Sequence, residues 1–284
     1  MAVRISVTVT VAPDAHVRRL LAPTGVATPH QMPLGFAVDG APFTLTGEAN
    51  TGQMAALISP APGRPLILRY SLADGGTAYP EALFTPRASC FTRAADDLVG
   101  HARRIADAAT DGDEAIAAIV ADVAAAFTYG HPESRFNDGL DHIPQLACGT
   151  AEGSCVDINT YLIAALRAAG FEAGYVTGYF FPAEKHGACD DMHCWVVIRQ
   201  SDRVEEWDIA HHLKMGAGEI RARLNPKPGE RVALAHSMGL DFPEAGIGQL
   251  KLLAEPVWVD SNGRTEKADV TIRMGEGAKR PEPA

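Results

Sequence analysis

A cysteine stands where the sequence predicts the start of a helix, in the stretch Gly153-Ser154-Cys155-Val156-Asp157. Ser154 is a favourable N-cap residue, and Asp157, three positions later, completes a variant of the capping box. Apolar residues then recur at helical spacing until Gly170, a residue suited to ending a helix. Cys155 is therefore expected in the first turn, where the helix dipole and unpaired N–H groups favour a thiolate. A thiolate is a nucleophile for acyl transfer, and the alternative is a small buried cysteine with a structural role.

A histidine and an aspartate follow on two segments that are predicted to form a hairpin. His193 begins a strand-like run to residue 200, and residues 204–209 are predicted to return as a second strand. If Ser201 and Asp202 form a two-residue turn, His193 is the diagonal neighbour of Asp208 on one face. Asp208 can then orient His193, and His193 can accept the proton of Cys155. The alternatives are a core histidine with satisfied nitrogens and an aspartate that caps the following loop.

These residues resemble the transglutaminase-like superfamily, in particular its bacterial branch of cysteine-protease-like proteins. The resemblance implies a papain-like α+β catalytic core with Cys155 as nucleophile, His193 as general base and acid, and Asp208 as the group that orients His193. It also implies a thioester intermediate that water or an amine resolves, and it requires no metal or organic cofactor. The resemblance is carried by Gly153–Asp157, Leu166–Phe171, Ala173–Tyr179, His193–Trp195 and Trp207–Asp208, and more weakly by Tyr79–Ser89 and Ala126–Tyr129.

Two positions depart from the pattern of that superfamily. Proline usually follows the aspartate, but here Ile209 does. Arginine often follows the nucleophile in bacterial members, and here Val156 takes that place. Neither change removes a member of the Cys155–His193–Asp208 triad, but both could reshape the acyl pocket. Gln145 is the candidate for a side-chain oxyanion donor.

Elements outside this region predict two domains and a tail. Residues 1–88 contain short apolar segments separated by Pro and Gly, which favours an antiparallel β-sandwich-type domain. Residues 89–274 are assigned to the transglutaminase-like catalytic domain, and residues 275–284 to a flexible tail. Within the catalytic domain, helices are predicted over 96–109, 113–127 and 155–169, and a late hairpin pairs 256–260 with 268–274.

Composition excludes several functional classes. The chain has 284 residues, 46% of them hydrophobic, and a net charge of −10, so a nucleic-acid partner is not expected. No stretch of about 18 apolar residues occurs and the first residues alternate as in a strand, so neither a membrane span nor a signal peptide is predicted. Five cysteines are an odd and small number for a disulfide scaffold, which favours the cytoplasm. The oligomeric state is not indicated.

The sequence thus predicts a cysteine-dependent acyl-transfer enzyme that acts on peptide or protein amide bonds. Hydrolysis is favoured over transamidation because water is always available to resolve a thioester. One alternative is a catalytically inactive transglutaminase-like scaffold. Another is a zinc site, although the spacing of the candidate ligands matches no common zinc motif. Those candidates are Cys189, Asp190, Asp191, His193, Cys194, His211 and His212.

Overall fold

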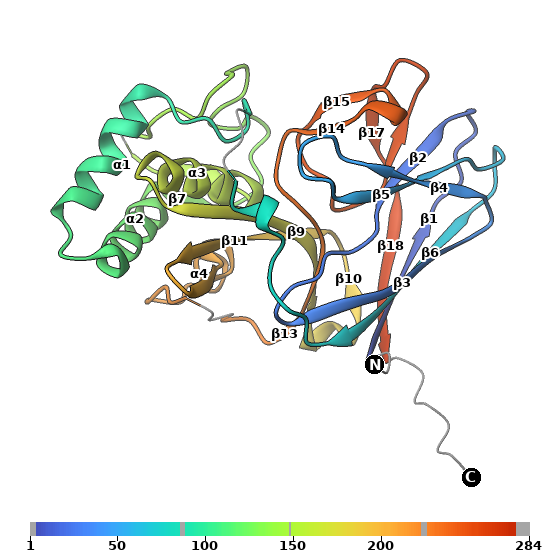
Figure 1. Ribbon diagram of the computed structural model, residues 1–284, viewed down its shortest axis with the longest axis horizontal. Helices are drawn as coiled ribbons and strands as arrows, with labels where there is room; N and C mark the ends of the chain where they lie inside the picture. Colours follow the sequence, from blue (N-terminus) through green and yellow to red (C-terminus); the bar gives the residue numbers. More distant parts are fainter. Residues whose placement is uncertain (1–3, 86–88, 148, 223–225, 277–284) are drawn as a thin grey trace, which may run out of the picture. The chain divides into compact units, whose positions relative to one another are not determined.

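The computed structural model describes residues 4–85, 89–147, 149–222 and 226–276 (Figure 1). They form two compact units, each assembled from segments distant in sequence. The first unit comprises residues 4–82, 177–193 and 229–276, and the second comprises residues 83–176 and 194–228 apart from the gaps just given. All four α-helices of the described chain lie in the second unit, while the first consists mainly of antiparallel strands. The fold class is therefore α+β, as the sequence predicts.

The first unit is built on two antiparallel sheets of five strands each. The first sheet has the order β10-β18-β1-β6-β3 and the second has the order β17-β16-β2-β5-β4. The strands of the first sheet are β1 (Ile5–Val11), β3 (Gln31–Asp39), β6 (Leu66–Asp74), β10 (Ala188–Cys189) and β18 (Val270–Glu276). Those of the second are β2 (Arg19–Pro23), β4 (Phe43–Gly47), β5 (Met54–Ile58), β16 (Val257–Val259) and β17 (Thr265–Lys267).

The two sheets share one hydrophobic core, which explains the alternation in the sequence. Val7, Val9 and Val11 of β1 are fully buried, while Thr10 between them is exposed. Their cluster also contains Leu20 from the second sheet and further apolar residues from both sheets. A strand with one buried face shows this period of two. The sandwich-type arrangement predicted for the N-terminal region is therefore confirmed.

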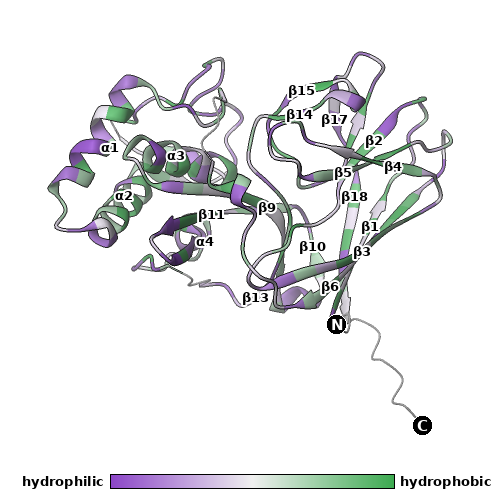
Figure 2. Ribbon diagram, in the orientation of Figure 1, coloured by the Kyte–Doolittle hydropathy of each residue, from purple (hydrophilic) through white to green (hydrophobic). Residues whose placement is uncertain are grey.

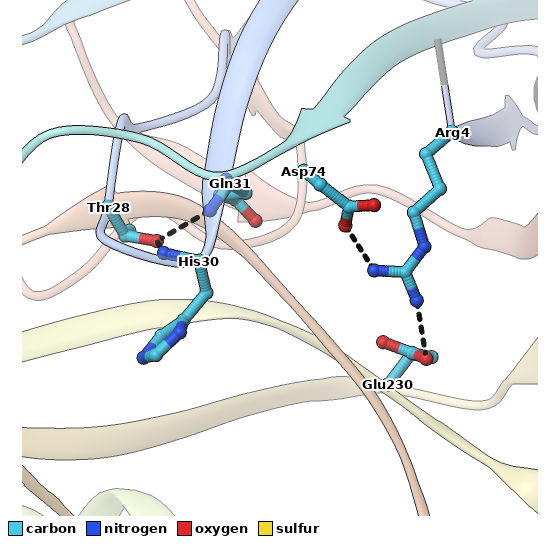
Figure 3. Close-up of polar contacts among 6 residues, drawn as sticks. All are labelled: Arg4, Thr28, His30, Gln31, Asp74 and Glu230. Atoms are coloured by element: carbon cyan, nitrogen blue, oxygen red, sulfur yellow. Dashed lines mark hydrogen bonds and ion pairs between the residues drawn. The ribbon is translucent and has the colours of Figure 1, made fainter. Parts of the chain in front are cut away.

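Polar contacts fix loops around this core (Figure 3). The guanidinium of Arg4 donates to Asp74 and, at 3.0 Å, to Glu230, so three distant segments of the first unit meet there. The Thr28 hydroxyl accepts the backbone N–H of Gln31 at 3.2 Å in a turn before β3. These contacts are structural.

The second unit contains the helices. α1 (Asp96–Ala108), α2 (Gly112–Ala126) and α3 (Cys155–Ala168) pack on one another, and α4 (Ile209–Met215) packs against α3. α2 and α3 are largely hydrophobic (Figure 2); α3 is buried along nearly its whole length, whereas α2 buries one face. The three longer helices coincide with the predicted helical ranges to within one residue at each end.

A four-stranded sheet has the order β12-β11-β9-β13. Its strands β9 and β11 each contain a boundary between the two units, so each contributes residues to both. The strands are β9 (Glu172–Pro182), β11 (Met192–Gln200), β12 (Arg203–Trp207) and β13 (Gly229–His236). Two short pairs complete the described strands: β7 (Phe127–Tyr129) with β8 (Ala151–Gly153), and β14 (Leu240–Phe242) with β15 (Ile247–Leu250).

The predicted late hairpin is wrong in its second strand. Residues 257–259 pair with Thr265–Lys267, whereas residues 270–276 pair with β1 in the other sheet. The turn is tight because the carboxylate of Asp260 accepts the backbone N–H groups of Asn262 and Arg264. The returning strand therefore starts directly after the turn, and the chain then crosses to the first sheet.

The predicted strand over 204–209 is too long by two residues. β12 ends at Trp207, and Ile209 already belongs to α4. The change occurs at Asp208, whose side chain caps the new helix by accepting the backbone N–H of His211 at 3.1 Å. A capping aspartate favours the start of a helix over continuation of the extended segment.

The boundary predicted at residue 88 stays a prediction, and it falls among residues 86–88, which lie outside the described part of the chain. Of the predicted tail, residues 277–284 lie outside it as well, while residues 275 and 276 belong to β18. Among the helices that the structure describes, none has the length and apolar character needed to cross a membrane.

Candidate active site

Cys155 is the first residue of α3, as the sequence predicts. The carboxylate of Asp157 accepts the backbone N–H of Ser154 at 2.9 Å and its hydroxyl at 2.6 Å, which closes the capping box. At the other end, Gly170 has φ +92° and the N–H of Phe171 reaches the carbonyl of Leu166, which completes a Schellman motif. Both ends of the helix are thus fixed, and the Cys155 side chain lies at its N-terminus.

The residue before the capping serine must be glycine. A Cβ on Gly153 would lie 2.9 Å from Cδ1 of Phe127 and 3.1 Å from Cβ of Asp157. Gly153 also pairs with Tyr129 in the parallel β7–β8 ladder, and its carbonyl accepts the N–H of Gly130. The backbone just before Cys155 is therefore held between a ring and a strand.

A buried carboxylate lies two residues after the candidate nucleophile. The Asp157 side chain is only 2% exposed, and its second oxygen lies 3.6 Å from Nη1 of Arg135. A buried charge needs a compensating partner, and Arg135 provides it from the loop between β7 and β8. The arginine therefore ties this loop to the first turn of α3.

The helix is fastened to β11 by a buried amide. Nδ2 of Asn159 donates to the backbone carbonyl of Cys194 at 3.0 Å, and its distance to the Cys194 sulfur is 3.4 Å. Tyr175 is fully buried beside them: burial, followed by the proximity of Cys194 and Cys155, raises its pKa well above the usual range. Asn159 lies one helical turn after Cys155, and Cys194 directly follows His193 in the strand.

The predicted hairpin register is confirmed over the paired residues. Val196 pairs with Trp207 and Gln200 with Arg203, which leaves Ser201 and the residue after it as a two-residue turn. Ser201 has φ +53°, as the first position of such a turn requires. An even register keeps alternate residues of β11 on the face that the sequence predicts.

His193 is buried near the start of β11, with its ring centroid 5.9 Å from that of Phe180. It is the last residue of its segment of the first unit, whereas Cys155 and Asp208 belong to the second. α3, which begins at Cys155, and α4, which is capped by Asp208, pack on each other. The pairing of His193 with either residue stays a prediction.

Asp208 is buried and makes more contacts than the sequence predicts. One carboxylate oxygen accepts the His211 N–H, and the other lies 2.8 Å from Nδ1 of the His211 ring. The backbone carbonyl of Asp208 is 2.8 Å from Nδ1 of His212. The simpler reading, that Asp208 caps the following segment, is therefore confirmed, and a cap can still serve an orienting role.

Sequence reasoning missed His211 as a partner of Asp208 and considered it only as a zinc ligand. The available signal was the spacing Asp208-x-x-His211, which is the spacing of an N-cap residue and its N3 position. Gln145, the oxyanion candidate, is half-buried, and its backbone N–H lies 3.4 Å from the Asp97 carboxylate. This contact ties Gln145 to the first turn of α1, and it does not support the oxyanion role.

Several residues of the alternative zinc site have protein partners. The thiol of Cys189 donates to the carbonyl of Asp191, and burial raises the pKa of this thiol to about 11. Asp190 accepts from Lys185, and Cys194 contacts Asn159. These contacts account for Cys189, Asp190 and Cys194 without a metal ion.

Part of the chain matches a known protein family, and the chain is similar to solved structures. Residues 100–207 match the model of the transglutaminase-like superfamily. The chain is similar to the crystal structure of a candidate cysteine protease from Cytophaga hutchinsonii, with 12% identity, a TM-score of 0.60 and coverage of 100% of this chain and 93% of that one. It also matches the periplasmic domain of TgpA from Pseudomonas aeruginosa bound to ethylmercury, with 17% identity, a TM-score of 0.40 and coverage of 76% and 92%.

Comparison with curated proteins gave no match. At 12% identity, the likeness to the Cytophaga protein shows a shared fold. The matched segment contains α3, its capped N-terminus and the hairpin β11–β12. Residues 100–207 of this chain belong to the transglutaminase-like superfamily.

Proposed function

We propose that the protein is a cysteine-dependent acyl-transfer enzyme in which Cys155 is the nucleophile. The observation that carries this proposal is the position of Cys155 as the first residue of a buried helix with a closed capping box. The positive end of the helix dipole stabilises a thiolate there, and N–H donors in the first turn of a helix can stabilise an oxyanion.

The proposed reaction uses His193 as the acid and base. His193 accepts the proton of Cys155, and the sulfur bonds to the carbonyl carbon of an amide or ester. The tetrahedral intermediate collapses as the bond to the leaving group breaks, and the leaving group takes the proton from His193. A water molecule, deprotonated by His193, then attacks the thioester and releases a carboxylic acid and the thiol. In this scheme Asp208 orients the His193 ring.

The proposed substrates are peptide or protein amides, with hydrolysis favoured over transfer to an amine. Two features support a role for β11 in the reaction. Asn159 holds the strand against α3 next to His193 in the chain, and the confirmed hairpin register places Asp208 just beyond the end of β12. No metal or organic cofactor is part of the proposed mechanism.

Thiol labelling tests the nucleophile directly. We expect iodoacetamide at pH 7–8 to modify Cys155 much faster than Cys189, which is equally buried. A thiol of pKa about 11 is ionised to only about 0.1% at pH 8. Digestion and mass spectrometry over a time course would give the rate for each cysteine.

Activity is then measured with p-nitrophenyl acetate and with a library of peptide amides. Cys155→Ala and His193→Ala should each abolish turnover, and the wild type should form a Cys155 acyl adduct. Equal labelling rates for Cys155 and Cys189, with no effect of either variant, would instead indicate an inactive scaffold. Stoichiometric zinc in protein purified without chelator would favour the metal-site alternative.

A further inference from the structure

The carboxylate of Asp208 is held by a residue of its own helix. Asp208 is 1% exposed, and its Oδ1 accepts the backbone N–H of His211 at 3.1 Å. Its Oδ2 lies 2.8 Å from the Nδ1 atom of the same histidine, which is itself 6% exposed. One residue therefore contacts both oxygens, through its backbone and through its ring.

The short distance between Nδ1 of His211 and Oδ2 of Asp208 indicates which ring nitrogen of the histidine carries a hydrogen. Nδ1 of His211 is in ion-pair contact with the carboxylate, and two lone pairs 2.8 Å apart would repel, so the contact favours a hydrogen on Nδ1. The neutral ring then has its lone pair on Nε2. His211 thus presents a positioned N–H group to Asp208.

Asp208 still has capacity to act on a second ring. Each carboxylate oxygen has two lone pairs; Oδ1 accepts the His211 backbone N–H, and Oδ2 is in close contact with the His211 ring. A carboxylate offers about four lone-pair sites in all, so it can accept the N–H groups of more than one residue, an imidazole included. With both oxygens contacted, the side chain has little freedom to rotate away from a fixed direction.

We propose that His211 is a positioning residue, which fixes the Asp208 carboxylate so that it can orient the general base. This inference rests on the proposed function, because it gives His211 a role only if His193 and Asp208 act on Cys155. The backbone N–H of His211 and its ring together contact the aspartate through the first turn of α4, a turn that begins with Ile209.

Two substitutions of similar polarity test whether a nitrogen at the Nδ1 position of His211 is what positions Asp208. The side-chain nitrogen of asparagine lies near the position of histidine Nδ1, whereas that of glutamine lies near Nε2. We expect His211→Asn to keep kcat for p-nitrophenyl acetate within about threefold of the wild type. His211→Gln should lower kcat roughly tenfold or more with KM nearly unchanged, because misplacing a catalytic group is costly while substrate contacts remain.

A double-mutant cycle separates positioning from a purely structural effect. Asp208→Asn keeps an N-cap acceptor for α4 but removes the carboxylate. If His211 acts through that carboxylate, His211→Gln should cost less than about twofold in the Asp208→Asn background. His101→Gln is the matched control, since His101 forms another His–Asp pair in the same unit, 2.9 Å from Asp122; it should leave kcat unchanged.

The outcomes are distinct for the two proposals. Turnover that depends on Cys155 but is equal in His211→Asn, His211→Gln and the wild type would overturn the role of His211 alone. Equal losses from His211→Gln in both backgrounds would show that the histidine acts through packing and would also overturn it. Absence of Cys155-dependent turnover and labelling in the wild type would overturn the proposed function, and the role of His211 with it. If His211→Gln does not fold, a loss in His211→Asn of tenfold or more would still contradict the proposal.

Discussion

Nδ2 of Asn159 donates a 3.0 Å hydrogen bond to the backbone carbonyl of Cys194, and both residues are fully buried. The bond joins the second turn of the helix that begins at Cys155 to the strand residue that follows His193. It is the contact between these two elements that bears most directly on the candidate site.

Asn159→Ala should destabilise the protein and lower its activity. A buried carbonyl left without its donor costs roughly 1–3 kcal/mol, and β11 loses its fixed position against α3. Chemical denaturation would measure the free energy of unfolding, and kcat would be measured on the folded variant. Asn262→Ala, in an exposed turn, is the control and should change the free energy by no more than about 0.5 kcal/mol. An unchanged kcat in folded Asn159→Ala would contradict the role assigned to this bond.

Arg135→Gln should shift the pH dependence of Cys155 alkylation. The arginine compensates the buried charge of Asp157, two residues from the sulfur. Without it, the carboxylate disfavours a thiolate nearby, so the midpoint of the alkylation rate against pH should move to higher pH. Arg203→Gln removes an arginine from an exposed pair with Asp113 and should leave the midpoint unchanged. A shift of the same size in both variants would indicate a general charge effect.

Glu48 should contribute to stability in a defined pH range. Burial raises its pKa, but hydrogen bonds from Asp241, Thr51 and Asn50 outweigh this effect and lower the pKa from 4.5 to about 2. A carboxyl with a depressed pKa stabilises the folded state above its unfolded value, and this contribution is lost as pH falls from about 4.5 to about 2.

The measurement compares Glu48→Gln with the wild type by denaturation between pH 2 and 7. The variant should be less stable by roughly 1–3 kcal/mol at pH 7, and the difference should shrink toward pH 2. Glu219→Gln is the control, since Glu219 is an exposed residue. A difference independent of pH would show that the charge of Glu48 is not what stabilises the loop.

Local signals were sufficient to predict the helix of the candidate nucleophile. Ser154, Asp157 and Gly170 are close in sequence to the ends they define, so capping rules identify α3 and place Cys155 in its first turn. The two-residue turn at Ser201 fixes the register of the β11–β12 hairpin in the same way. Each of these features depends on residues only a few positions apart.

Features that depend on distant contacts were not predicted. The hairpin after Val257 was assigned to the wrong partner because the strand at 270–276 pairs with β1, more than 250 residues earlier. The helix after Asp208 was missed because it is short, and its stability depends on packing against α3 and on the capping side chain. Arg135 gave no signal because its partner Asp157 lies across a long loop.

The pairing of β1 with both β6 and β18 has a consequence for synthesis on the ribosome. Ile5 is matched with Leu72 on one side and with Glu276 on the other. The first of these neighbours emerges early, but the second is translated only after the whole of the helical unit. Until β18 is synthesised, one edge of β1 in the nascent chain lacks the strand that pairs with it. A chaperone that shields this edge should therefore raise the yield of native protein.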